Sequence, residues 1–382
     1  MTQTLQVPRV SAAKTPDRPR RSRSIPGRTL VEVGGSVLAA VCVVWISFAI
    51  AGITGPLGFG VCSVAAFFVI YGVLCWLLHG VLAMKDRLAT FAIWTGALTA
   101  LVPLLAVIGY VIAKGLPVVA AGFPGFFVKD FSDYTATAPV TAVGAGAAIV
   151  GTVEQVGLAA LFTVPLGILT ATYLVNFRNT LSRVSGSVVD AMTGSPAIIF
   201  GLVIYLLWVK PQKEAGQTGL AASLALSLMM LPIVTRTAQE VISIVPGSLK
   251  EAAMALGSPQ WRSILRVTLP TARVGLVTAV ILGIARVAGE TAPVLFDAGG
   301  NANYNWNPFG GKQDDLPLRI YEMISQPGVN ATRDAWGVAF VLVLVVLALF
   351  VMARLIGSKS PGPRRWTVPW RKSISSASGD AQ

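Results

Sequence analysis

The sequence predicts an all-α polytopic membrane protein, and three observations lead to this prediction. Apolar residues make up 54% of the 382 residues and charged residues only 12%, whereas soluble domains contain roughly 25% charged residues. The apolar residues gather in stretches near the roughly 20 residues that a helix needs to cross the hydrocarbon core. Lys and Arg fall mainly on one side of these stretches, as expected of membrane proteins. We therefore expect about eight transmembrane helices, near residues 34–54, 60–83, 88–113, 144–175, 189–209, 218–236, 273–296 and 335–356.

The chain begins with a basic segment, residues 1–33, which we predict to be a disordered cytoplasmic tail attracted to anionic lipid. A transit peptide or twin-arginine signal is the alternative, but no apolar pattern follows its arginines closely, and the next span is too long for a cleaved signal. Residues 358–382 are predicted to be a second basic tail.

Residues 34–87 hold the first two predicted spans. All three cysteines, Cys42, Cys62 and Cys75, lie there, and in lipid a thiol acts as a small hydrophobic group, so neither a disulfide framework nor a metal site is implied. The lone His79 is expected to be a polar interface residue at the cytoplasmic end of a span.

The remaining six spans occupy residues 88–357. With the amino terminus inside, 22 Lys and Arg side chains lie on the cytoplasmic side, 7 lie outside and one lies within a span, which accounts for all 30. This distribution predicts that both termini are cytoplasmic and explains most of the net charge of +13. Because the positive charge is scattered over tails and loops, it gives little support to a nucleic-acid partner.

A polar segment at residues 246–270 separates the sixth and seventh spans. Ser248 and Glu251 have the spacing of a capping box, which predicts a short helix that starts at Leu249. Gly257 can adopt the left-handed conformation that ends such a helix. A helix this short is marginal in water, so it needs a partner surface.

A second helix is predicted to restart at Ser258 and Pro259 and to end at Pro270. The alternative is an amphipathic loop on lipid headgroups, with Arg262 and Arg266 contacting phosphates. That alternative suits the second helix and leaves the first unexplained.

The same segment matches the EAA signature of ABC-importer permeases at Glu251, Ala252, Ala253, Gly257, Leu269 and Pro270, with Val267 in place of the usual isoleucine. The resemblance implies that the first helix is a coupling helix. Such a helix sits in a cleft of an ABC ATPase subunit, so that ATP-driven closure moves the transmembrane helices.

Signatures of catalysis are missing from the sequence. The nearest approach to a phosphate-binding loop is Gly310-Gly311-Lys312-Gln313, which lacks the earlier glycine and the Ser or Thr after Lys. We therefore expect a membrane transport subunit that is not an enzyme and has no cofactor or metal, with ATP bound by a partner ATPase.

Charged residues inside predicted spans mark a candidate translocation path, since each costs at least about 2.5 kcal/mol at a helix centre. Arg286 and Glu290 stand four residues apart, so they can pair on one helix face within the seventh span. Arg236 lies at the cytoplasmic end of the sixth span, and Glu154 and Gln155 interrupt the fourth. A partly neutralised positive charge suits passage of an anion. An ion pair that merely pins helices together is the alternative.

Roughly residues 140–355 resemble the PstA family of phosphate-importer permeases, one branch of the type I ABC-importer permeases. The similarity lies in TATYLVNF at 170–177, DAMTGSPAIIFGLVIY at 190–205, LPIVTRT at 231–237, IARVAGETAPVLFDAGG at 284–300 and LPLRIYEMI at 316–324. The resemblance implies roles in transport for Arg236, Arg286 and Glu290. The chain departs from the family in its two extra spans before residue 88 and at Asp190–Thr193, where the family more often has a Leu-Ala pair.

The resemblance also implies partners and a location. The partners would be PstB-like ABC ATPase subunits, a PstC-like second permease and an extracytoplasmic PstS-like phosphate-binding protein, which the external segment 297–334 would help to meet. The location would be the bacterial plasma membrane, in contact with its lipid. The alternatives are a permease for another small oxyanion or solute, and a non-transporting scaffold or sensor that contacts an ATPase.

Overall fold

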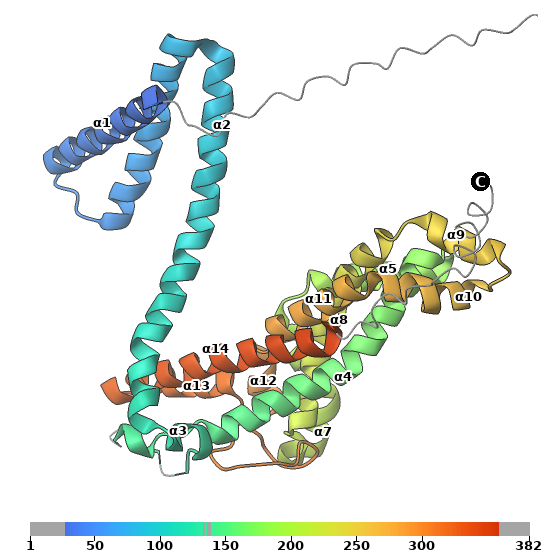
Figure 1. The fold of residues 1–382 in the computed structure, drawn as a ribbon. Coiled ribbons are helices and arrows are strands. Elements are labelled where there is room, and N and C mark those ends of the chain that lie inside the picture. The colour runs from blue at the N-terminus through green and yellow to red at the C-terminus, as the bar shows by residue number, and fades with distance from the viewer. Residues whose placement is uncertain (1–26, 133, 136–138, 359–382) are drawn as a thin grey trace, which may run out of the picture. The chain divides into compact units, whose positions relative to one another are not determined.

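The computed structural model describes residues 27–132, 134–135 and 139–358 (Figure 1). Over these residues the chain is helical apart from its loops, and its one bridge of the β type joins Gly299 to Gln313. The predicted all-α class is therefore confirmed. Residues 1–26 and 359–382, which make up most of the two predicted tails, lie outside the described residues.

The chain divides into two units, residues 1–106 and 107–382. The first contains α1 (Gly27–Ala51) and most of α2 (Pro56–Gly122). α1 begins at Gly27, so the last residues of the predicted tail, up to 33, are helical. Contacts of the Glu32 carboxylate explain part of this extension. The carboxylate forms an ion pair with Arg87 Nη1 at 2.9 Å and lies 3.7 Å from His79 Nε2.

Two predicted spans merge in α2. Its Gly80 has φ 83° and ψ 172°, which is non-helical, so the helix breaks there, near the end of the second predicted span. Glycine reaches this positive φ without the penalty of a Cβ. The core of the first unit holds four small or aromatic side chains from both helices, namely Ala40, Val44, Tyr71 and Cys75.

The second unit begins within α2 and contains the remaining helices. Two short helices, α3 (Gly125–Val128) and η1 (Val140–Ala142), precede the long helix α4 (Gly146–Asn176). Next come α5 (Thr180–Thr193), α6 (Ala197–Ile204), the π-helical η2 (Tyr205–Val209), α7 (Lys210–Gln212), η3 (Lys213–Gly216) and α8 (Gly219–Ser243). The chain ends with α9 (Gly247–Ala255), α10 (Gln260–Ser263), the π-helical η4 (Ile264–Thr268), α11 (Leu269–Val287), α12 (Ala292–Asp297), α13 (Leu316–Ser325) and α14 (Val329–Ser358).

Six of the described helices are long and apolar enough to cross a membrane, or up to seven if a bent pair counts as one span. That pair is α5 with α6, which meet at 107°. The continuous fifth span predicted at 189–209 is therefore wrong. Pro196 is the physical reason, because a proline disfavours helical backbone at the residue before it. The count of eight spans remains a prediction.

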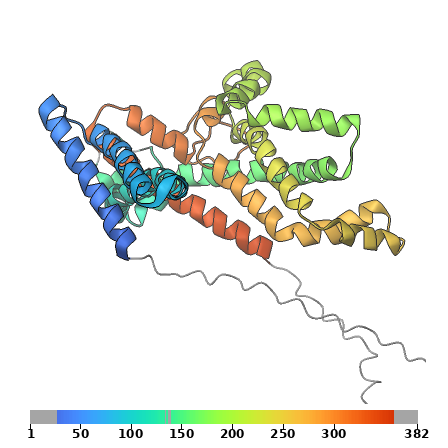
Figure 2. The same ribbon diagram turned by 90° about the horizontal axis from the view of Figure 1, so that it is seen from above.

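The core of the second unit lies around α8, which packs against α4 and α11 (Figures 1 and 2). Small side chains along α8 let its neighbours approach closely: Ala221, Ala222, Ser223 and Ala225 are all 0% exposed. At the contact with α4, a Cβ on Gly167 would meet Val234 Cγ1 at 3.0 Å. This close packing therefore holds the residues near the ends of α8 in place.

Three glycines, Gly144, Gly146 and Gly151, allow other segments of the same unit to approach closely. An added Cβ would overlap Lys129 O at Gly144, Tyr304 Oη at Gly146 and Asp314 O at Gly151. Ordinary packing within the unit thus accounts for all three.

Replacing Gly151 by Val is expected to destabilise the protein by about 1–3 kcal/mol, the usual cost of overpacking. Gly157→Val is the matched control on the same helix, since a Cβ there meets nothing within 4 Å. Thermal unfolding in detergent should show a lower midpoint for the Gly151 variant alone. Equal midpoints for the two variants would contradict this packing.

Candidate functional site

Arg286 and Glu290 form an ion pair at the end of α11. The Arg286 side chain is 58% exposed and that of Glu290 is 13% exposed. The predicted pairing is confirmed, but the continuous helix predicted over 273–296 is wrong, because α11 ends at Val287 and Glu290 lies in the break before α12. Pro293, near the start of α12, has no backbone N–H with which to continue the preceding helix.

A cavity of about 260 Å³ lies beside Arg286. The break between α5 and α6 and one face of α8 provide its other walls, through Met192, Thr193, Ser195, Ala197, Phe200, Met229, Pro232 and Ile233. Arg286 is the charged residue among them. Two hydroxyl protons of the lining are already engaged, since Thr193 Oγ1 donates to Val189 O at 2.9 Å and Ser195 Oγ donates to Ala191 O at 3.0 Å. A guanidinium beside an otherwise uncharged cavity is suited to attract an anion.

Arg236 lies on α8 and is bonded to a different set of residues. Its guanidinium forms an ion pair with Asp190 of α5, and it donates to Gly186 O at 3.1 Å and to Gln239 Oε1 at 2.7 Å. The structure therefore brings Arg286 and Glu290 together and places Arg236 in a separate cluster. The sequence interpretation missed Asp190 as a partner, although an acidic residue at the start of a predicted span was a signal for it.

The predicted coupling helix is α9. It begins at Gly247, with Pro246 at its N-cap and no side-chain cap, so the predicted capping box and the start at Leu249 are wrong. The fixed φ of Pro246, −57°, leads the backbone into the helix. None of its residues is buried, Glu251, Ala252 and Ala253 included.

Gly257 ends the coupling helix as predicted, with φ 82°. Its N–H donates to Met254 O at 2.9 Å, and Ser258 N–H donates to Ala253 O at 3.1 Å, which closes the helix end. Leu256, the residue before Gly257, is 90% exposed. This exposed apolar end is suited to contact with a partner.

The second helix of the segment differs from its prediction. α10 starts at Gln260 with Pro259 at the N-cap, and the chain continues through the π-helical η4 into α11. The helix therefore does not end at Pro270. The wider π turn just before Pro270 accommodates a residue that cannot donate a backbone hydrogen bond.

One side-chain bond ties the coupling helix to the transmembrane helices. Lys250 Nζ of α9 donates to Asn176 Oδ1, the last residue of α4, at 2.8 Å. The start of α9 and the end of α4 are thus linked through their side chains.

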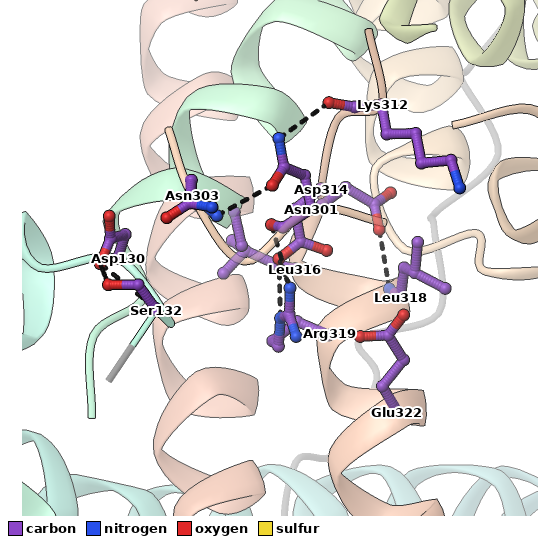
Figure 3. A network of polar contacts seen from close by, with 12 residues as sticks. Asp130, Ser132, Asn301, Asn303, Lys312, Asp314, Leu316, Leu318, Arg319 and Glu322 are labelled. Atoms are coloured by element: carbon purple, nitrogen blue, oxygen red, sulfur yellow. Dashed lines mark hydrogen bonds and ion pairs between the residues drawn. The ribbon is translucent and has the colours of Figure 1, made fainter. Parts of the chain in front are cut away.

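A buried polar network holds the segment after α12, which was predicted to be external (Figure 3). Arg319, 8% exposed, pairs with Asp314 at 2.6 Å and with Glu322 at 2.9 Å, and its guanidinium lies over the Phe131 ring at 4.4 Å. Burial raises the pKa of Asp314 to about 7 although Arg319 lowers it. Burial also raises the pKa of Asp315 well above its usual range.

The two polar interruptions of the fourth span take part in the same network. Glu154 accepts from Gln313 Nε2 at 2.5 Å, and Gln155 Nε2 donates to Gln313 Oε1 at 3.2 Å. Both residues therefore anchor the segment after α12 to α4. Within the described ranges, no group of three or more His, Cys, Asp or Glu side chains is placed to hold a metal ion.

Asp297 ends α12, beyond the candidate span that closes at Val287, and it is 0% exposed. Neither of its carboxyl oxygens has a partner among the described residues. Burial raises its pKa from 3.8 to about 8. The folded chain thus keeps a proton that the unfolded chain loses, so this group's contribution to stability declines as the pH rises from about 4 to about 8.

The variant Asp297→Asn is expected to remove that contribution, because an amide does not titrate. Its thermal midpoint in detergent should depend less on pH than that of the unsubstituted chain and should exceed it at pH 8.5. Thermal scans at pH 5, 7 and 8.5 measure this. An unchanged slope would contradict the buried, protonated state of Asp297.

Comparison with known proteins gives one consistent family. Residues 163–359 match the family described as "Binding-protein-dependent transport system inner membrane component". A "Phosphate transport system permease protein PstA 1" of Mycobacterium tuberculosis (strain ATCC 25618 / H37Rv) is 37% identical over 280 residues, 72% of this chain and 87% of that protein.

Other organisms also have similar proteins. The PstA permease of Pasteurella multocida is 34% identical over 62% of this chain and 84% of its own length. A probable PstA permease of Methanocaldococcus jannaschii is 33% identical over 71% of this chain and 93% of its own length. The family match over residues 163–359 and the identity to these relatives show that the chain belongs to the PstA family of ABC-importer permeases.

Proposed function

We propose that this chain is the permease subunit of an ATP-driven importer of inorganic phosphate. Arg286 is the observation that carries the proposal, since its guanidinium is more than half exposed beside a cavity and is partly neutralised by Glu290. Planar guanidinium groups match the oxygens of phosphate and can form two parallel hydrogen bonds with it. The relatives' names, which specify phosphate transport, support the same cargo.

The charge balance suits passage as well as binding. An isolated arginine in a low-dielectric path would hold an anion tightly, whereas a carboxylate four residues away weakens that hold. Arg236, with its own partner Asp190, offers a second cationic position. Phosphate would meet Arg286 first and Arg236 next on its way to the cytoplasm.

This chain would share the path with a second, PstC-like permease facing the exposed side of Arg286. A PstS-like binding protein would deliver phosphate outside, against the segment that Arg319 and Gln313 hold. PstB-like ATPase subunits would bind ATP and contact α9, so the chain needs no ATP site and no cofactor of its own.

The mechanism is alternating access. Closure of the ATPase subunits would move α9, and the bond between Lys250 and Asn176 would transmit that movement to α4. The path would open outward in one state and inward in the other, because the partners bind the two states differently. The positive-inside distribution of Lys and Arg supports cytoplasmic termini in a bacterial plasma membrane.

Uptake of labelled phosphate at limiting phosphate tests the proposal in cells that lack the chain and in cells in which it is restored. Sulfate and molybdate uptake are the controls. Selective loss and rescue of phosphate uptake is the expected result. Loss of sulfate or molybdate uptake with normal phosphate uptake would identify a permease for another oxyanion, and normal uptake of all three would favour a scaffold or sensor.

A further inference from the structure

The ion pair between Asp190 and Arg236 lies next to the cavity of Arg286. Asp190 is three residues from Thr193 on α5, and Arg236 is three residues from Ile233 on α8. Thr193 and Ile233 both line the cavity. Residues three apart share a helix face, so the pair lies one helical turn beyond the cavity wall on both helices.

The order of the helices along the chain shows on which side of the cavity the ion pair lies. Going from Ile233 to Arg236 leads along α8 toward its end at Ser243, just before α9. Going from Thr193 to Asp190 leads back toward the start of α5, which follows the end of α4. The end of α4 is bonded to α9 through Asn176 and Lys250. The ion pair therefore lies beyond the cavity wall on the side of the coupling helix.

The pair is accessible and able to exchange partners. The Asp190 side chain is 68% exposed and that of Arg236 is 30% exposed. Asp190 is the charged partner of Arg236, and the other two acceptors, Gly186 O and Gln239 Oε1, are neutral. Exposed ion pairs contribute little to stability, typically about 0.2–1 kcal/mol, so an incoming anion can compete with the carboxylate for the guanidinium.

We propose that Asp190 is the residue that releases the transported anion from Arg236. The inference rests on the function proposed above. Between transport events the Asp190 carboxylate pairs with the Arg236 guanidinium. When an anion has moved from the cavity to Arg236, the carboxylate displaces it. Asp190 acts through Arg236 and is a positioning residue. It keeps the second cationic position from trapping phosphate.

The variant Asp190→Asn keeps the shape of the side chain and removes its charge. Without the competing carboxylate, phosphate should leave Arg236 more slowly. We expect the maximal rate of phosphate uptake and the apparent KM to fall together, each by roughly two- to fivefold, the factor that exposed ion pairs typically contribute. Asp190→Glu should restore most of the rate, because it restores the charge.

Labelled-phosphate uptake by the complete importer measures these values, together with the double variant Asp190→Asn/Arg236→Gln. Asp190→Asn should add no further change in a chain that already carries Arg236→Gln. Glu240→Gln is the matched control, since Glu240 is an exposed acid one turn beyond Arg236 and is outside the cavity wall; it should behave as the unsubstituted chain does.

Two results would overturn the inference while the unsubstituted importer still transports phosphate. One is an Asp190→Asn variant with a lower rate and an unchanged or higher KM, as expected if the pair only holds α5 against α8. The other is an additive loss in the double variant. An unsubstituted complex that does not import phosphate would remove the proposed function and this inference with it.

Discussion

Arg286→Gln is expected to lower phosphate uptake by roughly 10- to 100-fold, the factor that corresponds to losing a hydrogen bond from a charged group. The glutamine keeps a polar side chain beside the cavity and removes the fixed positive charge, which leaves Glu290 without its partner. Initial rates of labelled-phosphate uptake measure the effect. Arg286→Lys should retain part of the activity, because it keeps the charge and loses the planar pair of donors.

Arg273→Gln is the control for this prediction. Arg273 lies on the same helix as Arg286, outside the cavity wall, so its loss should leave uptake nearly unchanged. Near-normal uptake by Arg286→Gln would contradict the assignment of Arg286 to the path.

The exchanged variant Arg286→Glu/Glu290→Arg distinguishes a role of Arg286 in the translocation path from a purely structural role of the ion pair. If the pair only joins the end of α11 to the break before α12, the exchange restores it and should restore uptake. If Arg286 attracts the anion, the exchange puts a carboxylate beside the cavity, and uptake should remain low although the chain folds.

Gly257→Val is expected to abolish the coupling of ATP hydrolysis to transport. Gly257 has φ 82°, and a Cβ there would meet nothing within 4 Å, so the cost comes from the backbone and not from a clash. The left-handed conformation costs roughly 1–2 kcal/mol in residues with a Cβ, and β-branched residues tolerate it least. The end of α9 should therefore rearrange and displace Leu256.

Gly257→Asn is the control at the same position, because asparagine adopts the left-handed conformation more readily. Both phosphate uptake and the stimulation of ATPase activity by loaded binding protein should be lost in the valine variant and largely kept in the asparagine variant. If the chain were instead a scaffold or sensor, it would remain assembled with the ATPase in both variants. Full coupling in the valine variant would contradict the role assigned to α9.

The features that could be predicted from sequence are those set by local chemistry. Gly257 has the predicted left-handed backbone, because a glycine after a short helix has few other roles. Arg286 and Glu290 pair across the end of α11, since a spacing of four residues brings two side chains together even where the helix is about to stop. Apolar length was sufficient to predict the all-α class.

The features that were missed depend on residues distant in sequence or on backbone irregularities. Asp190 and Arg236 are 46 residues apart, and only the packing of α5 on α8 brings them together. Pro196 is where the predicted fifth span breaks, whereas Pro270 lies inside a continuous helix because a π turn precedes it. The same residue type thus gives opposite outcomes in two contexts.

The central claim is most directly tested in proteoliposomes that contain this chain with its partner permease and ATPase, with loaded phosphate-binding protein on the outside. ATP-dependent accumulation of labelled phosphate, unaffected by excess sulfate and strongly reduced by Arg286→Gln, is the predicted result. Accumulation that is the same with Arg286→Gln, or that requires a different anion, would contradict a phosphate path past Arg286.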